Sequence, residues 1–369
     1  GENFSTAELH AVLLVFATPV FGTASGDIGR HYCPGDGVPD GEPSLDVIVA
    51  HGKEMQQVAD AVVYHVRDMH APSVLPPRRA FQTQRMAVFT WESQCCAPES
   101  EMSHPSFMAQ FDTLVSVHAS ADVRISYAEP QSVSAWRSLV PYEERFEVPL
   151  AWAVSNCDPK GHRTVYALEL SRYMPMHIYG PCPFANAKFP DSIAGNRTAE
   201  DEYLAHYKFY FAAENAVVPG YVTEKFFRAL NRGNVPVVLG APDTLSLAPL
   251  PWAFLHVKDH GSPQRMAAML LDLAADRMQF ERLLEWKHAP EAHWSQGFRD
   301  TVHRQYWVCR LARLVSRTRG TVPDALDPLP KCSDGLQFQG LLDPALRKAA
   351  VVDLARRVQK PGWHDIWAT

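Results

Sequence analysis

The densest group of polar side chains lies between residues 207 and 231, in the stretch YKFYFAAENAVVPGYVTEKFFRALN. Six residues that can bind a ligand stand between an aromatic run and an amphipathic run: Glu214, Asn215, Tyr221, Thr223, Glu224 and Lys225. Lysine in the first turn of a helix is unfavourable beside the positive end of the helix dipole. It is better tolerated when an anion such as a diphosphate binds there, next to the unpaired N–H groups. The pattern predicts an anion site, although a surface helix with a solvated lysine also fits it.

These side chains need a strand that ends before Glu214 and a helix that begins after Thr223. KFYFAAE is apolar and aromatic enough for a buried strand, and threonine is favoured at the N-cap of a helix. In an open α/β sheet, ligands bind beyond the carboxyl ends of the strands, where helix N-termini present free N–H groups. Glu224 and Lys225 are therefore expected in the first helical turn, facing a ligand at the sheet edge.

The second half of the chain alternates strands and helices at short intervals, as a Rossmann-like nucleotide-binding domain requires. The expected strands are VPLAWAVSN, MHIYG, KFYFAAE and VPVVLG, and the expected helices cover residues 162–172, 199–206 and 224–231. Further helices are predicted at 263–275 and 278–287, and a packing helix at 344–358 in the tail.

The first half contains a second series of strand-like runs. They occupy residues 12–17, 45–50, 61–66, 86–91, 114–118 and 123–127. Several are apolar on both faces, which suits a buried parallel sheet. Pro130, Pro141 and a charged cluster then break the pattern, so we expect the domain linker there. The sequence thus predicts an α/β fold, with an N-terminal Rossmann-like domain at 1–146, a second at 147–316 and a tail at 317–369 whose helix packs on the domains.

Length and charge narrow the classes of function. A chain of 369 residues exceeds one usual core, and a net charge of -6 with a pI near 6.2 leaves no basic footprint for nucleic acid. The strongest apolar run, from Ala11 to Phe21, is too short to span a bilayer and lacks the basic flank of a signal peptide. We expect a buried strand there, no nucleic acid partner and no membrane span in this chain.

The seven cysteines contain no C-x-x-C pair, which argues against a zinc site. Two N-glycosylation sequons, at Asn3 and Asn196, join the cysteines in favouring an oxidising, secretory compartment. Cys157 and Cys182 flank one helix–strand unit, and both a disulfide and a pair of buried thiols fit them. The glycine-rich stretch FGTASGDIG, at 21–29, is expected to be a surface loop, because the prolines after it prevent the helix of a dinucleotide-binding motif.

The stretch that begins at residue 207 resembles the donor-binding signature of the α-1,3-fucosyltransferases that use GDP-fucose, YKF…ENS…DYITEK…A…G..PVVLG. The preceding block, VPLAWAVSNCDPKGHRTVYALELSRYMPMHIYG, is similar to the block before the signature in that family. ADAVVYHVRDM…RMAVFTWES, FLHVKD and YWVCR also have counterparts there, so the resemblance covers about residues 60–312.

The resemblance implies a GT-B type glycosyltransferase, in which two Rossmann-like domains face a cleft. It implies inverting transfer of L-fucose from GDP-fucose to O3 of GlcNAc in a glycan or glycoprotein. VSNC, YVTEKFF and GAPD favour the N-glycan core as the acceptor. The alternatives are a Lewis-type antennal α-1,3-fucosyltransferase and a catalytically silent relative that binds glycans or sugar nucleotides.

The sequence and the resemblance also bear on cofactors and on location. The chain has no D-x-D triplet to hold a metal on the diphosphate. We therefore expect no required cofactor and no metal ligand, with stimulation by Mn²⁺ left open. Family members are usually Golgi type II membrane proteins. The chain is accordingly expected to be a catalytic ectodomain of the Golgi lumen, attached to the membrane only through an anchor that it lacks.

Individual roles follow from the same resemblance. Glu92, in FTWES at the end of a first-domain strand, matches the general base. Arg163 and Lys225 match the cations that contact the diphosphate. Glu224 matches a carboxylate near the ribose and the fucose, and Tyr221 an aromatic beside the donor. Further donor contacts are expected from Ser155, Asn156, Glu214, Asn215 and Thr223.

Simpler interpretations stay open for two of these residues. Glu92 could be a strand-end carboxylate in water, and Arg163 could solvate the start of a helix. The chain also departs from the family, with AENA in place of FENS and Gly220 where an aspartate is usual. Gly220 removes one polar contact near the donor.

The cysteine after YWVCR is a further departure. Relatives that act on N-glycan cores have a second cysteine where Ala312 stands here. A disulfide of Cys309 would then need another partner, for which Cys332 is the candidate.

Overall fold

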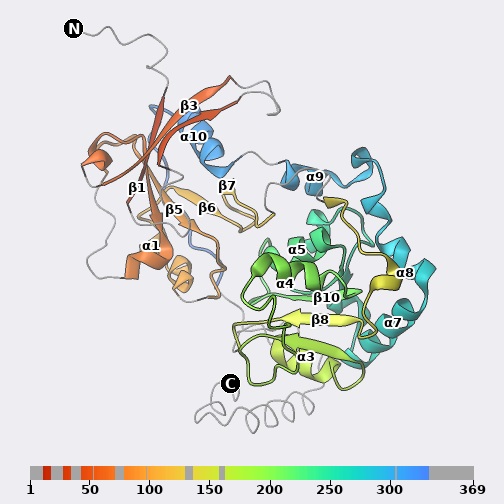
Figure 1. Ribbon diagram of the computed structural model, residues 1–369. Coiled ribbons are helices and arrows are strands. Elements are labelled where there is room, and N and C mark those ends of the chain that lie inside the picture. Colours follow the sequence, from red (N-terminus) through yellow and green to blue (C-terminus); the bar gives the residue numbers. More distant parts are fainter. Residues whose placement is uncertain are drawn as a thin grey trace, which may run out of the picture. The chain divides into compact units, whose positions relative to one another are not determined.

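The computed structural model describes residues 11–17, 28–34, 43–52, 54–70, 79–96, 98–128, 136–157, 163–303 and 306–331. These residues form two compact units, each built on its own sheet (Figure 1). Unit 1 contains the described residues up to 125 and those from 306 to 331, and unit 2 contains those from 126 to 303. The predicted tail helix at 344–358 and the sequon at Asn3 lie outside the described residues.

Unit 1 is a seven-stranded sheet in the order β2-β3-β1-β4-β5-β6-β7. The strands are β1 (Val12–Phe16), β2 (Gly29–Cys33), β3 (Leu45–His51), β4 (Ala61–His65), β5 (Arg85–Thr90), β6 (Thr113–Ser116) and β7 (Val123–Arg124). Every neighbouring pair is parallel except β2 and β3. Val62, Val88 and Phe111 lie in its buried core. The parallel sheet predicted for the first half is confirmed.

Strand β2 is missing from the sequence prediction, which placed a glycine-rich loop over 21–29. Most of β2 is exposed, and it pairs with β3 as an antiparallel edge. An edge strand needs no apolar run, so GRHYC carries no periodic signal. Residues 21–27 themselves are outside the described part of the chain.

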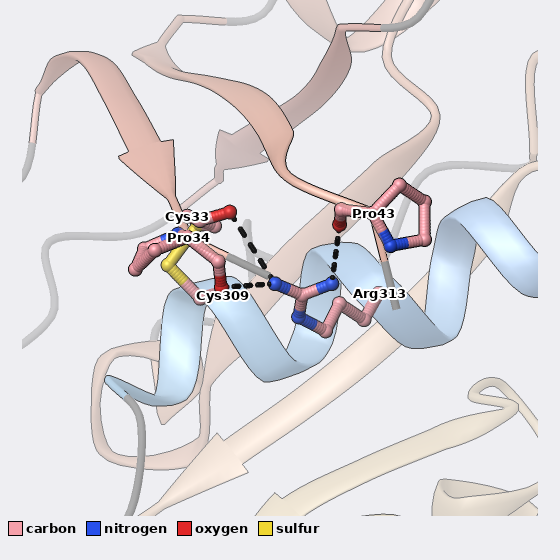
Figure 2. Close-up of a disulfide and its surroundings, with 5 residues drawn as sticks. All are labelled: Cys33, Pro34, Pro43, Cys309 and Arg313. Carbon is pink, nitrogen blue, oxygen red and sulfur yellow. Dashed lines mark hydrogen bonds between the residues drawn. A yellow bond between two sulfur atoms is a disulfide. The ribbon is translucent and has the colours of Figure 1, made fainter. Parts of the chain in front are cut away.

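Helix α10 (Trp307–Arg317) closes unit 1 by packing on β1 and β3. Cys309 in this helix forms a disulfide with Cys33, the last residue of β2 (Figure 2). One turn further, Arg313 donates from Nη1 to the Pro43 carbonyl at 2.9 Å and from Nη2 to the Pro34 carbonyl at 2.6 Å. The buried guanidinium therefore joins both chain segments beside the disulfide to the helix.

These contacts correct two expectations. The prediction that Cys309 pairs with Cys332 is wrong. Helix α10 packs beside β3, and Cys309 forms its disulfide with Cys33 at the end of β2. The compact units also differ from the predicted division at residues 146 and 316. The chain leaves unit 1 after residue 125, and α10 returns to it.

Unit 2 is a five-stranded parallel sheet in the order β12-β11-β10-β8-β9. Its strands are β8 (Leu150–Ala153), β9 (Met176–Tyr179), β10 (Phe209–Ala213), β11 (Val235–Leu239) and β12 (Leu255–His256). Its helices are α3 (Arg163–Leu170), α4 (Arg197–Leu204), α5 (Glu224–Arg232), α6 (Val257–His260), α7 (Pro263–Ala275), α8 (Arg277–Leu283) and α9 (Gln296–Val302). The alternation predicted for the second half is confirmed, except that the helix expected at 278–287 ends at Leu283 and continues as a 3₁₀ turn.

Helix α5 lies against this sheet through Phe226, Phe227 and Leu230, which are buried in the unit 2 core. It ends at Gly233, whose positive φ of 83° is a left-handed conformation that favours glycine. Across the described ranges, no helix has the length and apolar character needed to cross a membrane.

Candidate functional site

The strand order of unit 2 creates a switch point between β8 and β10. From β8 the chain continues outwards to β9 on one side, and from β10 it continues to β11 and β12 on the other. Ligands of open α/β sheets bind at such points, beyond the carboxyl ends of the strands. Ser155 and Asn156 follow β8, and Glu214 and Asn215 follow β10, so all four lie at this edge.

Arg163, the first residue of α3, connects the two strand ends. Its Nη1 donates to the Ala213 carbonyl at 2.8 Å and its Nη2 to the Asn156 carbonyl at 2.9 Å. The guanidinium lies over the Trp152 ring, 5.7 Å from its centroid. Arg163 is only 2% exposed, so the interpretation that it solvates a helix start is wrong. Burial lowers the pKa of Arg163, and its Nε has no partner among the described residues.

Glu214 fastens the start of α5 to the end of β10. Its carboxylate accepts from the Thr223 backbone N–H at 2.7 Å and from the Thr223 hydroxyl at 2.8 Å. Thr223 occupies the N-cap position as predicted, but its side chain makes no capping bond and donates to Glu214 instead. Glu214 is 2% exposed, and burial raises its pKa. A Cβ on Gly240 would stand 2.8 Å from the Glu214 Cγ, so glycine at the end of β11 leaves room for this carboxylate.

Lys225 lies in the first turn of α5 and is held by three acceptors. Its Nζ is 3.2 Å from Glu214 Oε2, 2.8 Å from the Thr223 hydroxyl and 3.1 Å from Glu224 Oε1. Burial lowers the pKa of Lys225, but the two carboxylates outweigh burial and the net shift is upwards. The unfavourable position of a lysine at a helix N-terminus is thus offset by two anions. Its side chain is 17% exposed, which contradicts a freely solvated lysine.

The other predicted donor contacts of unit 2 lie at the same sheet edge as Arg163 and Lys225. Burial raises the pKa of Glu224, but attraction to Lys225 and hydrogen bonds outweigh it, and the net shift is downwards. Arg163 is close enough to Lys225, Glu214, Glu224 and Tyr221 to interact electrostatically with each. Tyr221 is buried, whereas Ser155 and Asn156 are exposed. Asn215 has a buried side-chain oxygen with no partner among the described residues.

Glu92 lies in unit 1, two residues beyond the end of β5. Its N–H donates to the Thr90 hydroxyl at 3.0 Å, and its carboxylate is 3.9 Å from both Arg67 Nη2 and the Cys96 sulfur. The side chain is 26% exposed, so it is partly buried in a charged cluster and the interpretation as a carboxylate simply in water is wrong.

The sequence prediction missed the partners of Glu92. Arg67 Nε donates to Glu99 Oε1 at 2.8 Å, and Glu99 is completely buried. Burial, and then the nearby Glu92 and Glu99, raise the pKa of the Cys96 thiol to about 12. No motif in the sequence joins these residues, because they meet only through the pairing of β4 with β5.

Cys157 and Cys182 form a disulfide, which confirms one of the two predicted alternatives. It joins the segment after β8 to the segment after β9, beside Asn156 at the switch point. Within the described ranges, no three His, Cys, Asp or Glu side chains are grouped so that they could hold a metal ion.

Residues 144–325, just under half of the chain, match the family model "Glycosyltransferase family 10 (fucosyltransferase) C-term". The chain is 30% identical over 241 residues to human GDP-fucose protein O-fucosyltransferase 3, and the aligned region covers 62% of this chain and 49% of the relative. It is 33% identical over 236 residues to 4-galactosyl-N-acetylglucosaminide 3-alpha-L-fucosyltransferase FUT5 of Hylobates lar, covering 62% and 59%. The chain thus spans about half the length of the first of these relatives.

Solved structures agree at the level of the fold. A crystal structure of an α1,3-fucosyltransferase matches with a TM-score of 0.55 at 13% identity, covering 87% of this chain and 94% of that one. The same comparison with an α1,3-fucosyltransferase bound to GDP gives a TM-score of 0.53 at 12% identity, with the same coverage. The mixed α/β fold predicted from the sequence is therefore confirmed, and the predicted resemblance to the fucosyltransferases is confirmed by the family model that residues 144–325 match.

Proposed function

We propose that this protein transfers L-fucose from GDP-fucose to an acceptor hydroxyl with inversion at the anomeric carbon. The observation that carries the proposal is the pair of buried cations, Arg163 and Lys225, at the switch point of a Rossmann-like sheet. This is where such folds bind nucleotides, and relatives of the chain are named for their use of GDP-fucose.

The donor diphosphate would bind between Arg163 and the N-terminus of α5. Arg163 Nε has no partner among the described residues, and each of its Nη atoms has a second N–H besides the one that binds a carbonyl. Lys225 already directs all three N–H bonds to acceptors, so the diphosphate must replace one of them. Glu224 is the most suitable to move, because its side chain is 34% exposed and Glu214 is buried. Glu224 would then be free to meet the ribose or the fucose, as the family resemblance implies.

Glu92 would act as the general base. It would take the proton from the acceptor hydroxyl while that oxygen forms a bond to the anomeric carbon and the bond to the diphosphate breaks. GDP leaves with the electron pair, and inversion needs only this one carboxylate. Negative charge on the leaving group grows in the transition state, so the two cations and the α5 N–H groups bind that state more tightly than the ground state. The reaction is proposed to need no metal, and full activity in EDTA is the expected result.

The acceptor is proposed to be O3 of GlcNAc, in the core of an N-glycan. This choice rests on the motifs VSNC, YVTEKFF and GAPD. A second candidate is the hydroxyl of a serine or threonine in a protein, because the human relative is named a protein O-fucosyltransferase. Two disulfides, Cys33–Cys309 and Cys157–Cys182, support a location in the secretory pathway, and we propose the Golgi lumen.

Release of GDP from GDP-fucose tests the proposal. The purified chain is incubated with a core N-glycan, N-acetyllactosamine or a folded protein acceptor, and product mass identifies the acceptor. Fucose on the N-glycan core supports the full proposal, and fucose on a protein hydroxyl supports the second candidate. GDP binding without transfer to any acceptor would identify a silent relative.

A further inference from the structure

The sequon Asn196-Arg197-Thr198 lies at the start of α4, and the function proposed above makes no use of it. Both Asn196 and Thr198 are exposed. Asn196 is the N-cap of α4, and its Oδ1 accepts a hydrogen bond from the Ala199 N–H at 3.3 Å. Its Nδ2 makes no hydrogen bond to the described residues. A sugar attached to Nδ2 would leave the amide oxygen in place, so the capping bond and the modification are compatible.

A cavity of about 360 Å³ begins at the same place. Thr198 forms part of its wall, and two residues span at most about 7 Å, so a sugar on Asn196 starts beside it. The cavity is formed by α4 and the C-terminal part of α5, which is nine residues long. The α5 residues in its wall lie about 4.5–12 Å along the helix from Glu224, and none of the candidate donor-site residues lines it.

The walls of this cavity suit a carbohydrate. Tyr127, Trp136 and Phe227 contribute aromatic rings to the walls, and Asp201 forms ion pairs with Arg228 and Arg232. Aromatic rings with a few fixed polar groups are typical of small-ligand sites of this size.

Two buried residues in these walls carry donors without a partner among the described residues. The Arg232 side chain is 8% exposed, and its Nε and Nη1 have no partner among the described residues. The Trp136 Nε1 is also buried and has no partner among the described residues. Hydroxyl and acetamide oxygens of a sugar are acceptors of the kind that these donors need.

We propose that Asn196 carries an N-linked glycan and that the sugars nearest to the protein occupy this cavity. In the attachment step, Nδ2 forms a bond to the anomeric carbon of the first sugar and loses one proton. The bond from that carbon to a lipid-linked diphosphate breaks, and the diphosphate leaves with the electron pair. The disulfides of both units place folding in an oxidising compartment, where this donor is available. The proposal does not depend on transferase activity.

Peptide mass spectrometry tests the attachment. The chain is secreted from a eukaryotic host behind an added signal peptide, with three variants of the sequon. The parent and Thr198→Ser are expected to carry a glycan on Asn196. Thr198→Val and Asn196→Asp are expected to lack it, although Asn196→Asp keeps the capping oxygen. An unmodified Asn196 in the parent overturns the proposal.

Enzymatic release of the glycan tests whether its first sugars occupy the cavity. Ser138 is exposed and lines the cavity, so Ser138→Trp should fill it without disturbing the core. Release by peptide-N-glycosidase from the native parent is expected to be about tenfold slower than from denatured protein, as nine-tenths occupancy requires. Native Ser138→Trp should lose most of this protection, and its melting temperature should be unchanged. A second variant that fills the cavity, Thr198→Ser combined with Glu202→Trp, should lose the protection as well. Equal release rates from native and denatured parent would show that the first sugars do not occupy the cavity.

Discussion

Lys225 and Arg163 are both buried cations at the switch point, yet they are held by different partners. Arg163 is bound by backbone carbonyls that no ligand needs to displace. Lys225 is bound by two carboxylates, so its charge is already compensated before a ligand arrives. In the proposed complex a diphosphate would meet Arg163 without displacing its partners, whereas at Lys225 it would replace one of the present acceptors.

Replacing Lys225 by alanine is expected to weaken GDP binding by roughly 10- to 150-fold. A charge-assisted contact of this kind contributes about 1.5–3 kcal/mol. Isothermal calorimetry with GDP measures the effect, and Lys188→Ala, at an exposed lysine of the same unit, is the matched control. Thermal melting checks that the variant is folded, because Glu214 and Glu224 lose their cation. Unchanged GDP affinity in folded Lys225→Ala would exclude this residue from the donor site.

Glu92→Gln keeps the shape of the side chain and removes its basicity. The turnover of fucosyl transfer should fall by about 10²–10⁴-fold, which corresponds to roughly 3–5 kcal/mol in the barrier. GDP affinity should barely change, since Glu92 belongs to unit 1 and the donor residues belong to unit 2. Glu101→Gln, at an exposed glutamate nearby in the sequence, serves as the control. Transfer at more than about a tenth of the parental rate would show that another group is the base.

The common position of the candidate donor residues at one sheet edge could be predicted from the sequence, because they lie in two short blocks around β8 and β10. In each block a strand is followed by the ligand residues and then by a helix. This local order places the ligand residues at the carboxyl end of the strand, independently of contacts with distant parts of the chain. The partners Arg67 and Glu99 could not be predicted in this way. They join Glu92 across strands and a 3₁₀ turn, and a lone buried carboxylate has no periodic signature. The same limit applies to Gly240, whose need for glycine is visible only beside Glu214.

At the scale of elements, helix α5 is fixed at both ends by groups from distant segments. Glu214 holds its first turn, and Lys287 holds its last through the Asn231 carbonyl at 3.3 Å. Lys287 also donates to the Trp136 carbonyl at 2.7 Å and is completely buried. A neutral lysine has two N–H donors, which match these two carbonyls. Burial lowers the pKa of Lys287 to about 7, so the neutral form dominates above that pH.

This pKa shift predicts how the stability of unit 2 depends on pH. Between about pH 7 and the usual lysine pKa of about 10.4, the unfolded chain binds a proton at Lys287 that the folded chain lacks. Stability from this group therefore rises with pH in that window, by up to about 1.4 kcal/mol per pH unit, and is lost as pH falls through 7.

Lys287→Met should remove that dependence. Denaturant unfolding at pH 7.5 and pH 9.5 should show a smaller gain in the free energy of unfolding for the variant than for the parent, by roughly 2 kcal/mol. Lys258→Met is the control, because Lys258 is exposed and also donates to a carbonyl, that of Pro242. Parallel pH profiles for parent and Lys287→Met would contradict a neutral Lys287.

At the scale of the whole molecule, the chain returns to unit 1 after completing unit 2. Neither the composition nor the periodicity of residues 307–317 indicates which sheet the helix will cover, because an amphipathic helix fits either. The prediction assigned it to the second domain for its position in the sequence. The Cys33–Cys309 disulfide, between residues 276 positions apart, records a contact that no local pattern specifies.

Removing each disulfide should destabilise one unit only. Cys33 and Cys309 join β2 to α10 within unit 1, and Cys157 and Cys182 join the segments after β8 and β9 within unit 2. Closing a long loop restricts the unfolded chain more than closing a short one, so the bridge that spans 276 positions should contribute more than the one that spans 25. Each loss is expected to cost about 2–5 kcal/mol in its own unit.

Hydrogen exchange measured by mass spectrometry separates the two units in one experiment. In Cys33→Ser/Cys309→Ser, peptides of β1, β3 and α10 should exchange faster, because α10 loses its covalent link to β2 and keeps only its packing and the Arg313 hydrogen bonds. Peptides of β10 and β11 should keep the parental rate. Cys157→Ser/Cys182→Ser should give the opposite pattern, with faster exchange around β8 and β9. If both double variants loosened both sheets equally, the units would unfold as one cooperative body, and the return of α10 would stabilise the whole chain rather than unit 1 alone.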